Sequence, residues 1–219
     1  MLTDERRRAL AERFAFYTRF SDAERARFEE HVAHFLATKR FVSDRGEVDE
    51  PTRLGIAALA CRLTVNLTQW ELARIQCVNV VDELPGTQIG EMAGVVLPSV
   101  TFTREAVADA MRENDDGLNV VYHEIAHVLD AADGECDGIP LLDDPGERAT
   151  WRHVIARELE RLRAARELAI PTAIRSYGAR KESDLFATAT EAFFERPVRL
   201  RNAHPDLYAL LVAFYRQRP

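Results

Sequence analysis

The sequence predicts a mainly helical α+β fold with a small β-sheet. Apolar residues recur at helical spacing through most of the 219 residues, and two short runs rich in β-branched residues, 77–82 and 94–102, interrupt them. Hydrophobic residues make up 47% of the chain, which is enough to bury a sizeable core. We therefore expect one or two globular domains in which strands are inserted among helices.

The first part of the chain predicts helices. In FSDAERARFEEHVAHFLATKRF, Ser21 or Asp22 is placed as an N-cap, and apolar residues then follow at helical spacing. A further helix is expected from Pro51 through LGIAALACRLTVNL, because proline suits the first turn of a helix. We expect residues 1–75 to form an N-terminal helical region.

The second part is expected to form the domain on which this helical region packs. It covers residues 76–219 and begins with the two strands, with a turn at Pro85, Gly86 and Gly90 between them. The helical patterns REAVADAMREN, LNVVYHEIAHVLDAADG, ERATWRHVIARELERLRAAREL, SDLFATATEAFFERP and HPDLYALLVAFYRQRP follow. Gly134 is placed to end the second of these helices. One continuous domain is the alternative to this division.

Composition excludes several classes of function. The 29 basic and 36 acidic residues are interspersed, which gives a net charge of -7 with no basic tract for nucleic acid. The start, MLTDERRRALAERF, lacks the apolar core of a leader, and no run reaches the length of a membrane span. A cytoplasmic protein is therefore expected. The three cysteines follow no CxxC spacing, which argues against a disulfide framework or a cysteine zinc site.

Two histidines four residues apart form the main functional signal, in the stretch LNVVYHEIAHVLDAADG. Residues i and i+4 lie about 40° apart around a helix axis, so His123 and His127 can converge on one ion. Glu124 is offset by about 100° from His123, where it can reach a water in an open metal position. This is the HExxH pattern of zinc peptidases, with Glu124 as general base. The alternative is a metal-free helix with two packed histidines bonded to a carboxylate.

A catalytic zinc needs a third protein ligand, and the spacing leaves several candidates. The longer pattern HExxHxxGxxH would need glycine and histidine where the chain has Asp130 and Asp133. A carboxylate from a later helix is the other source, and the candidates are Glu182, Asp184 and Glu191. Asp184 and Glu191 are seven apart and share a face, so that one could bind the ion while the other orients a histidine.

Asp130 and Tyr177 are two further candidates. Asp130 follows His127 by nearly one turn, so it could accept a hydrogen bond from a ligating imidazole or cap the DAADG loop. Tyr177 lies in a predicted loop with Gly178 after it, and it could be a packed aromatic or a catalytic residue.

Taken together, these segments resemble the Mlc titration factor A family of zinc-dependent peptidases. The resemblance includes the early FSDAERARFEEHVAHFLATKRF, the central NVVYHEIAHVLDAADGECDGIPLL, the segment SYGARKESDLFATATEAFFERP and the closing HPDLYALLVAFYRQRP. It implies a gluzincin-like, zincin-like catalytic domain. It also implies that zinc is held by His123, His127 and Asp184, with Glu124 as base and Tyr177 stabilising the transition state. The chain departs from the family pattern at Asp184, where glutamate is expected.

Three functional expectations from different classes follow from the motif and the resemblance. The first is a zinc metallopeptidase acting on a peptide or protein substrate, with aminopeptidase-like activity as one form of it. The second is a non-catalytic binding or anti-repressor protein that keeps zinc and meets a transcriptional repressor of the Mlc type. The third is a structural domain without metal. Neither nucleic acid nor a membrane is expected as a direct partner.

Overall fold

The computed structural model describes residues 1–67, 69–84, 93–96, 98–112 and 115–219. They form two compact units, Met1–Glu113 and Asn114–Pro219. The boundary expected after residue 75 falls inside the first unit, because hydrogen bonds pair the strand that follows it with a strand from residues 40–43. The predicted turn at Pro85, Gly86 and Gly90 lies outside the described residues.

The first unit opens with helices. They are α1 (Asp4–Arg13), α2 (Ala15–Arg19), α3 (Asp22–Thr38) and α4 (Glu50–Thr64), with the 3-10 helix η1 (Gln69–Arg74) after them. Ser21 is the N-cap of α3 and forms a capping box with Glu24, which satisfies the first backbone N–H groups of that helix. Pro51 lies in the first turn of α4, as the sequence predicted.

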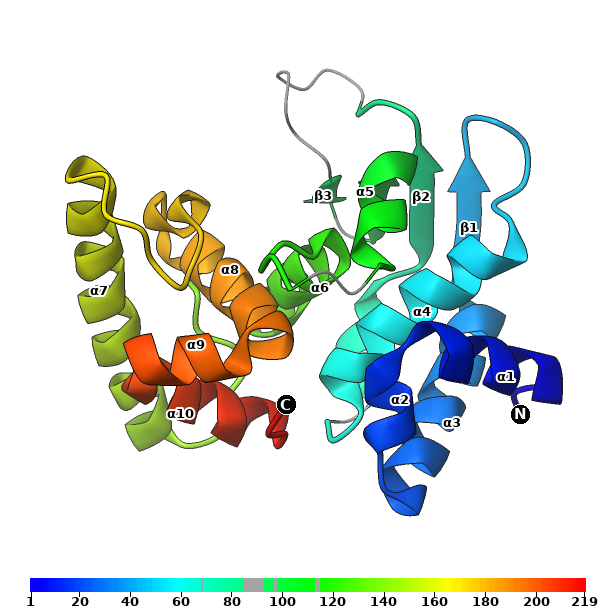
Figure 1. Ribbon diagram of the computed structural model, residues 1–219, viewed down its shortest axis with the longest axis horizontal. Helices are drawn as coiled ribbons and strands as arrows, with labels where there is room; N and C mark the ends of the chain where they lie inside the picture. Colours follow the sequence, from blue (N-terminus) through cyan, green and yellow to red (C-terminus); the bar gives the residue numbers. More distant parts are fainter. Residues whose placement is uncertain (68, 85–92, 97, 113–114) are drawn as a thin grey trace. The chain divides into compact units, whose positions relative to one another are not determined.

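A four-stranded sheet completes the first unit, in the order β1-β2-β4-β3. The strands are β1 (Arg40–Ser43), β2 (Cys77–Val81), β3 (Ala93–Val96) and β4 (Ser99–Thr103), and α5 (Arg104–Ala110) follows. β1, β2 and β4 are parallel, while β3 is antiparallel to β4. Figure 1 shows β1 and β2 side by side, with α4 in the connection between them. The single strand predicted over 94–102 is therefore two paired strands, and β1 was not predicted.

All regular elements described in the second unit are helices. Its elements are α6 (Val120–Asp130), η2 (Ala131–Asp133), α7 (Pro145–Glu167), η3 (Ser176–Ala179), α8 (Glu182–Glu195), α9 (Pro197–Ala203) and α10 (Pro205–Tyr215). α8 is the central helix, because it is buried at every position from Ser183 to Phe194 and contacts α6, η3, α7, α9 and α10. The expected loop around Tyr177 is the 3-10 turn η3, and Gly134 ends η2 rather than α6.

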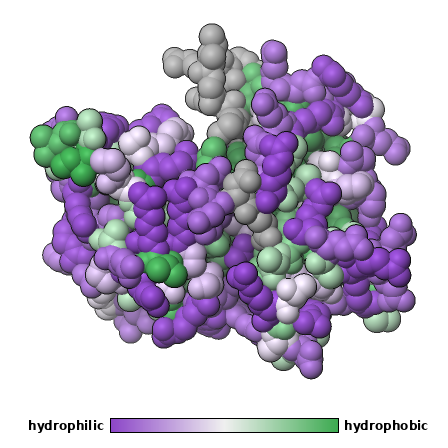
Figure 2. All heavy atoms as spheres, viewed as in Figure 1, coloured by the Kyte–Doolittle hydropathy of each residue, from purple (hydrophilic) through white to green (hydrophobic). Residues whose placement is uncertain are grey.

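The architecture confirms the predicted mainly helical α+β class. Within the described ranges, no helix has the length and apolarity that crossing a bilayer requires. Polar side chains cover most of the second unit in Figure 2, but apolar atoms gather at the C-terminal end of α7, where Leu168 is 70% and Ile170 is 54% exposed.

Candidate active site

Helix α6 carries the predicted HExxH residues on a buried surface. Asn119 caps the helix by accepting a hydrogen bond from the N–H of Tyr122, which fixes where its first turn begins. The rings of His123 and His127 then lie one turn apart, with centroids 4.9 Å from each other and an interplanar angle of 80°. Glu124 is buried beside them. The two rings are therefore neighbours in an edge-to-face arrangement on α6.

His123 is held by a fully buried carboxylate on α8. Its Nδ1 donates to Oε1 of Glu191 over 2.7 Å, and the same oxygen accepts a hydrogen bond from Nη2 of Arg175 at 2.6 Å. The backbone N–H of Asn119 donates to Oε2 of Glu191 at 2.8 Å. All three groups are donors, so both carboxylate oxygens of Glu191 already accept hydrogen bonds. With its proton on Nδ1, a neutral His123 leaves the lone pair of Nε2 for another partner.

His127 faces a second carboxylate of α8, that of Asp184. Its Nε2 lies 3.8 Å from Oδ1 of Asp184, which is too long for a hydrogen bond. Two ligands of a tetrahedral zinc at about 2.1 Å from the ion lie roughly 3.4 Å apart. Oδ2 of Asp184 is buried and has no hydrogen-bond partner among the described residues. These distances and this unpaired oxygen fit a cation between His127 and Asp184.

Two cations stand next to Asp184 at the surface. Nε of Arg180 lies 3.6 Å from Oδ2 of Asp184, and Nζ of Lys181 lies 4.0 Å from Oδ1. Both side chains are more than half exposed, so water screens their charge. A divalent ion bound to the buried oxygens would therefore compete with weak partners only.

The two histidines have opposite electrostatic environments. Burial lowers the pKa of His127 to about 3, and the positive charges of His123 and Lys181 add to this effect. Burial also acts to lower the pKa of His123, but the hydrogen bond and negative charge of Glu191 outweigh it, so that this pKa is raised. His127 is consequently a neutral imidazole at neutral pH, the form that binds metals.

Tyr177 lies beside the histidine pair. Its ring centroid is 5.5 Å from that of His123, and the guanidinium of Arg180 lies 4.7 Å above the tyrosine ring. The side chain is 40% exposed. Tyr177 is therefore accessible to solvent while its ring contacts His123.

Asp130 anchors a loop. Its Oδ2 accepts hydrogen bonds from the backbone N–H of Gly138 at 3.1 Å and from the thiol of Cys136 at 3.4 Å. Burial raises the pKa of Asp130 to about 6. These hydrogen bonds hold the segment 136–138, which follows the DAADG stretch, against the end of α6. Asp133, which stands where the longer pattern would need histidine, pairs with the guanidinium of Arg148 at 3.0 Å.

The second unit places His123 and His127 next to each other on α6, with Asp184 of α8 near His127 and Tyr177 beside His123. Sequence reasoning missed Arg175, which holds Glu191, and Cys136, whose thiol lies near His127. Neither residue belongs to a spacing pattern, so neither gave a signal that the sequence alone could reveal. Glu182 is exposed in the first turn of α8 and is not part of the cluster.

A helix carrying HExxH against a second helix with buried carboxylates is the arrangement of a metallopeptidase. The fold and the site therefore define a protein of the metallopeptidase type, in which a metal ion is expected.

The chain belongs to the family described as glucose-regulated metallo-peptidase M90, whose model matches residues 1–216. An uncharacterized protein of Synechocystis sp. is 31% identical to it, over 96% of this chain and 82% of that protein. Mlc titration factor A of Klebsiella pneumoniae is 28% identical over 91% of this chain and 81% of that protein. Mlc titration factor A of Escherichia fergusonii is 34% identical over 47% of this chain and 40% of that protein. The predicted resemblance is confirmed.

Proposed function

We propose that the chain is a zinc-dependent peptidase that hydrolyses peptide bonds. The observation that carries the proposal is the pairing of His127 and Asp184 across α6 and α8 at 3.8 Å, beside a second histidine whose Nδ1 is already engaged. His123, His127 and Asp184 would hold the ion. Two imidazoles and one carboxylate are one of the donor sets that catalytic zinc takes, and three protein ligands leave a position for water.

A zinc ion held by these three residues would lower the pKa of a water molecule to about 7 and would polarise the scissile carbonyl. Glu124, buried one residue after His123, accepts the proton of the attacking water and passes it to the leaving amine. Tyr177 donates its hydroxyl hydrogen bond to the carbonyl oxygen as negative charge develops on it. Glu191 and Arg175 take no part in the proton transfers. They position the site by keeping the ring of His123 in one orientation.

The test compares Glu124→Gln with wild type, because the amide keeps the size of the side chain but cannot accept the proton. We expect unchanged zinc content and fold, with nearly complete loss of peptidase activity. Tyr177→Phe should lower the rate by about 10² to 10³, the cost of losing one oxyanion donor. Equal turnover in Glu124→Gln and wild type would exclude this mechanism.

Two further measurements define the chemistry. Reconstitution of the stripped protein with Zn²⁺, Mn²⁺ or Mg²⁺ identifies the ion, and we expect zinc to restore most activity because nitrogen ligands favour it. Digestion of a peptide library tests aminopeptidase action, the narrower form of the proposal. Cleavage that requires a free N-terminal amine supports it, and internal cleavage contradicts it.

Binding to a transcriptional repressor is the second proposed role. It is favoured by the name of the relatives, Mlc titration factor A. The Glu124→Gln variant separates the two roles, because it removes the proton acceptor and leaves the surface unchanged. Repressor binding by this inactive variant would support a binding role independent of catalysis, while failure of wild type to bind an Mlc-type repressor would contradict it.

A further inference from the structure

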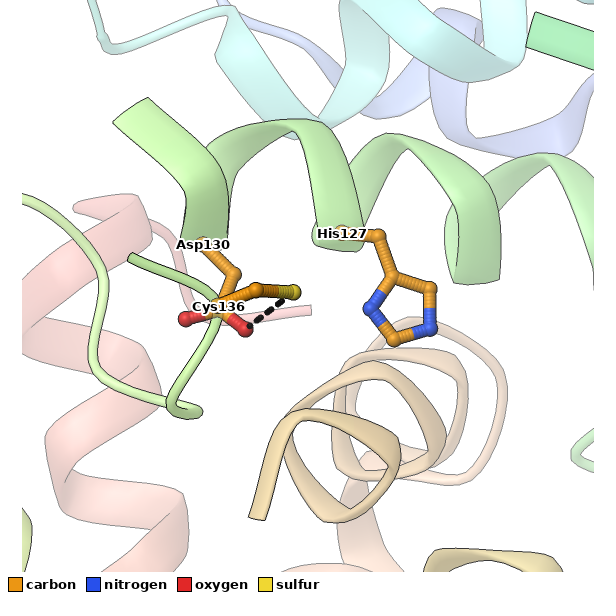
Figure 3. A group of neighbouring side chains, drawn as sticks. All are labelled: His127, Asp130 and Cys136. Carbon is orange, nitrogen blue, oxygen red and sulfur yellow. Dashed lines mark hydrogen bonds between the residues drawn. The ribbon is translucent and has the colours of Figure 1, made fainter. Parts of the chain in front are cut away.

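Three side chains with metal-binding atoms meet on the side of His127 that faces away from Asp184. One ligand atom each from His127, Asp130 and Cys136 lies within 4.8 Å of the others. Figure 3 shows a ring nitrogen of His127 turned toward the sulfur of Cys136, which in turn bonds to Asp130. Nε2 is the nitrogen near Asp184, so the one that faces the sulfur is Nδ1.

Two of these groups have unused polar atoms. Nδ1 of His127 is buried and makes no hydrogen bond with any part of the chain that the structure describes. Asp130 is fully buried, and its Oδ1 likewise lacks a partner among the described residues. Buried polar atoms without partners are costly, and a bound ion is one way to satisfy them.

We propose that His127, Asp130 and Cys136 form a second metal position, selective for thiophilic divalent ions such as Cd²⁺ and, in excess, Zn²⁺. One nitrogen, one oxygen and one sulfur donor make a set that these ions accept and that Mg²⁺ and Ca²⁺ do not. The thiolate and the carboxylate balance the charge of a dication in this partly buried place. On binding, the thiol of Cys136 gives its proton to the solvent as the sulfur–metal bond forms.

The loop that carries Cys136 is already held in position. The backbone N–H of Gly138 donates to Asp130, and its carbonyl accepts a hydrogen bond from the indole of Trp151 at 2.8 Å. Cys136 itself is exposed, so an ion can reach the sulfur from solvent. The sulfur lies 3.4 Å from Oδ2 of Asp130, close to the roughly 3.6 Å between a sulfur and an oxygen bound to one tetrahedral zinc. Only a small closure toward His127 completes the set.

This position shares His127 with the candidate active site, and its effect on activity rests on the proposed function. A neutral imidazole carries one lone pair, so an ion at Nδ1 and an ion at Nε2 compete for the same ring. Occupation of the second position therefore withdraws His127 from the catalytic set, and thiophilic ions inhibit.

The experiment is a titration of the metal-stripped protein with Cd²⁺, followed by the ultraviolet charge-transfer band of the cadmium–thiolate bond. We expect the band in wild type and its loss in Cys136→Ser, which retains the buried Cys61 and Cys77 as internal controls. Asp130→Asn and His127→Gln should each lower the affinity for Cd²⁺ by about tenfold or more. Even the loss of a residue that only hydrogen-bonds to a metal ligand lowers metal affinity by that much. His123→Gln is the matched control and should keep the band, because its ring does not belong to the set.

A band of wild-type affinity in Cys136→Ser would overturn the proposal. So would unchanged affinity in both Asp130→Asn and His127→Gln, because Cd²⁺ would then bind the thiol alone. The result is independent of catalysis: if Glu124→Gln stays active, the proposed function fails while the cadmium band still stands. For the link between them, we expect excess Zn²⁺ to inhibit wild type more strongly than Cys136→Ser, and equal inhibition contradicts the competition for His127.

Discussion

Replacing Glu191 by glutamine tests the roles assigned to two carboxylates of α8, with Asp184 as a metal ligand and Glu191 as the partner of His123. Glu191 is fully buried and accepts hydrogen bonds from Nδ1 of His123, from Arg175 and from the N–H of Asn119. Glutamine retains one acceptor oxygen and turns the other into an NH₂ group. Because every neighbour of this carboxylate is a donor, either orientation of the amide points a donor at a donor.

The expected loss of folding stability comes from the donors around Glu191 that lose their charged acceptor. Removing one partner of a buried ion pair costs about 3–5 kcal/mol. The side chain of Arg175 is 32% exposed and can recover part of its hydration, so the lower end, about 3 kcal/mol, is the expected loss. The ring of His123 also loses its fixed orientation, which should weaken zinc binding by about 10–100-fold.

Urea denaturation of the metal-free protein measures the first effect, and chelator competition measures the second. Glu195→Gln is the matched control, because Glu195 lies one turn later on α8 and accepts a hydrogen bond from the side-chain amide of Asn119 at 3.0 Å. A glutamine oxygen can still accept that bond. Unchanged urea stability in Glu191→Gln would refute the reasoning. Complete loss of zinc in Glu191→Gln, with zinc retained in Asp184→Asn, would make Glu191 the third ligand instead.

Three further predictions concern single groups around the same site. Asp184→Glu should lower zinc affinity in chelator competition, because Oδ1 is already 3.8 Å from His127 and an extra methylene adds about 1.5 Å of reach; tighter binding would contradict this. In the metal-free protein, His127 has a pKa of about 3 against 6.5 when unfolded, so the unfolded chain binds the extra proton and stability should fall as pH drops from about 6.5 toward 3. His127→Asn should flatten that dependence in urea denaturation at pH 7 and pH 5, and equal slopes would refute it. Gly138→Ala should lower the melting temperature more than Gly134→Ala: both glycines have positive φ, but an added Cβ lies 2.5 Å from the backbone oxygen of Glu182 only at Gly138. Equal losses would show that the contact with α8 is unimportant.

Local signals in the sequence were sufficient for most of the helices. The cap at Ser21, Pro51 in a first turn and the apolar spacing around HEIAH each depend on neighbours within one or two turns. Strand β1 was missed because its four residues follow α3 after a single cap residue, Lys39, and are recognisable only through their pairing with β2. The run 94–102 was read as one strand because both halves favour β structure, and the antiparallel pairing of β3 with β4 is a tertiary fact.

The same distinction between local and tertiary information applies to the candidate active site. Helix geometry fixes the spacing of His123 and His127 along α6, so their proximity could be predicted from the sequence. A spacing of seven also put Asp184 and Glu191 on one face, but which of them bonds to His123 depends on how α8 is rotated against α6. Arg175 joins the site through a contact between segments 16 residues apart that no repeat or motif announces.

The loop between η2 and α7 is hydrogen-bonded to a tryptophan whose fluorescence can report on the position of the loop. The indole of Trp151 is 2% exposed and holds the carbonyl of Gly138, the same residue whose N–H is bonded to Asp130. Movement of this loop breaks that indole bond and admits water, which shifts tryptophan emission toward longer wavelength. With Trp70, the chain's other tryptophan, changed to phenylalanine, the fluorescence of Trp151 alone would report the state of this wall of the site in real time, without any attached dye.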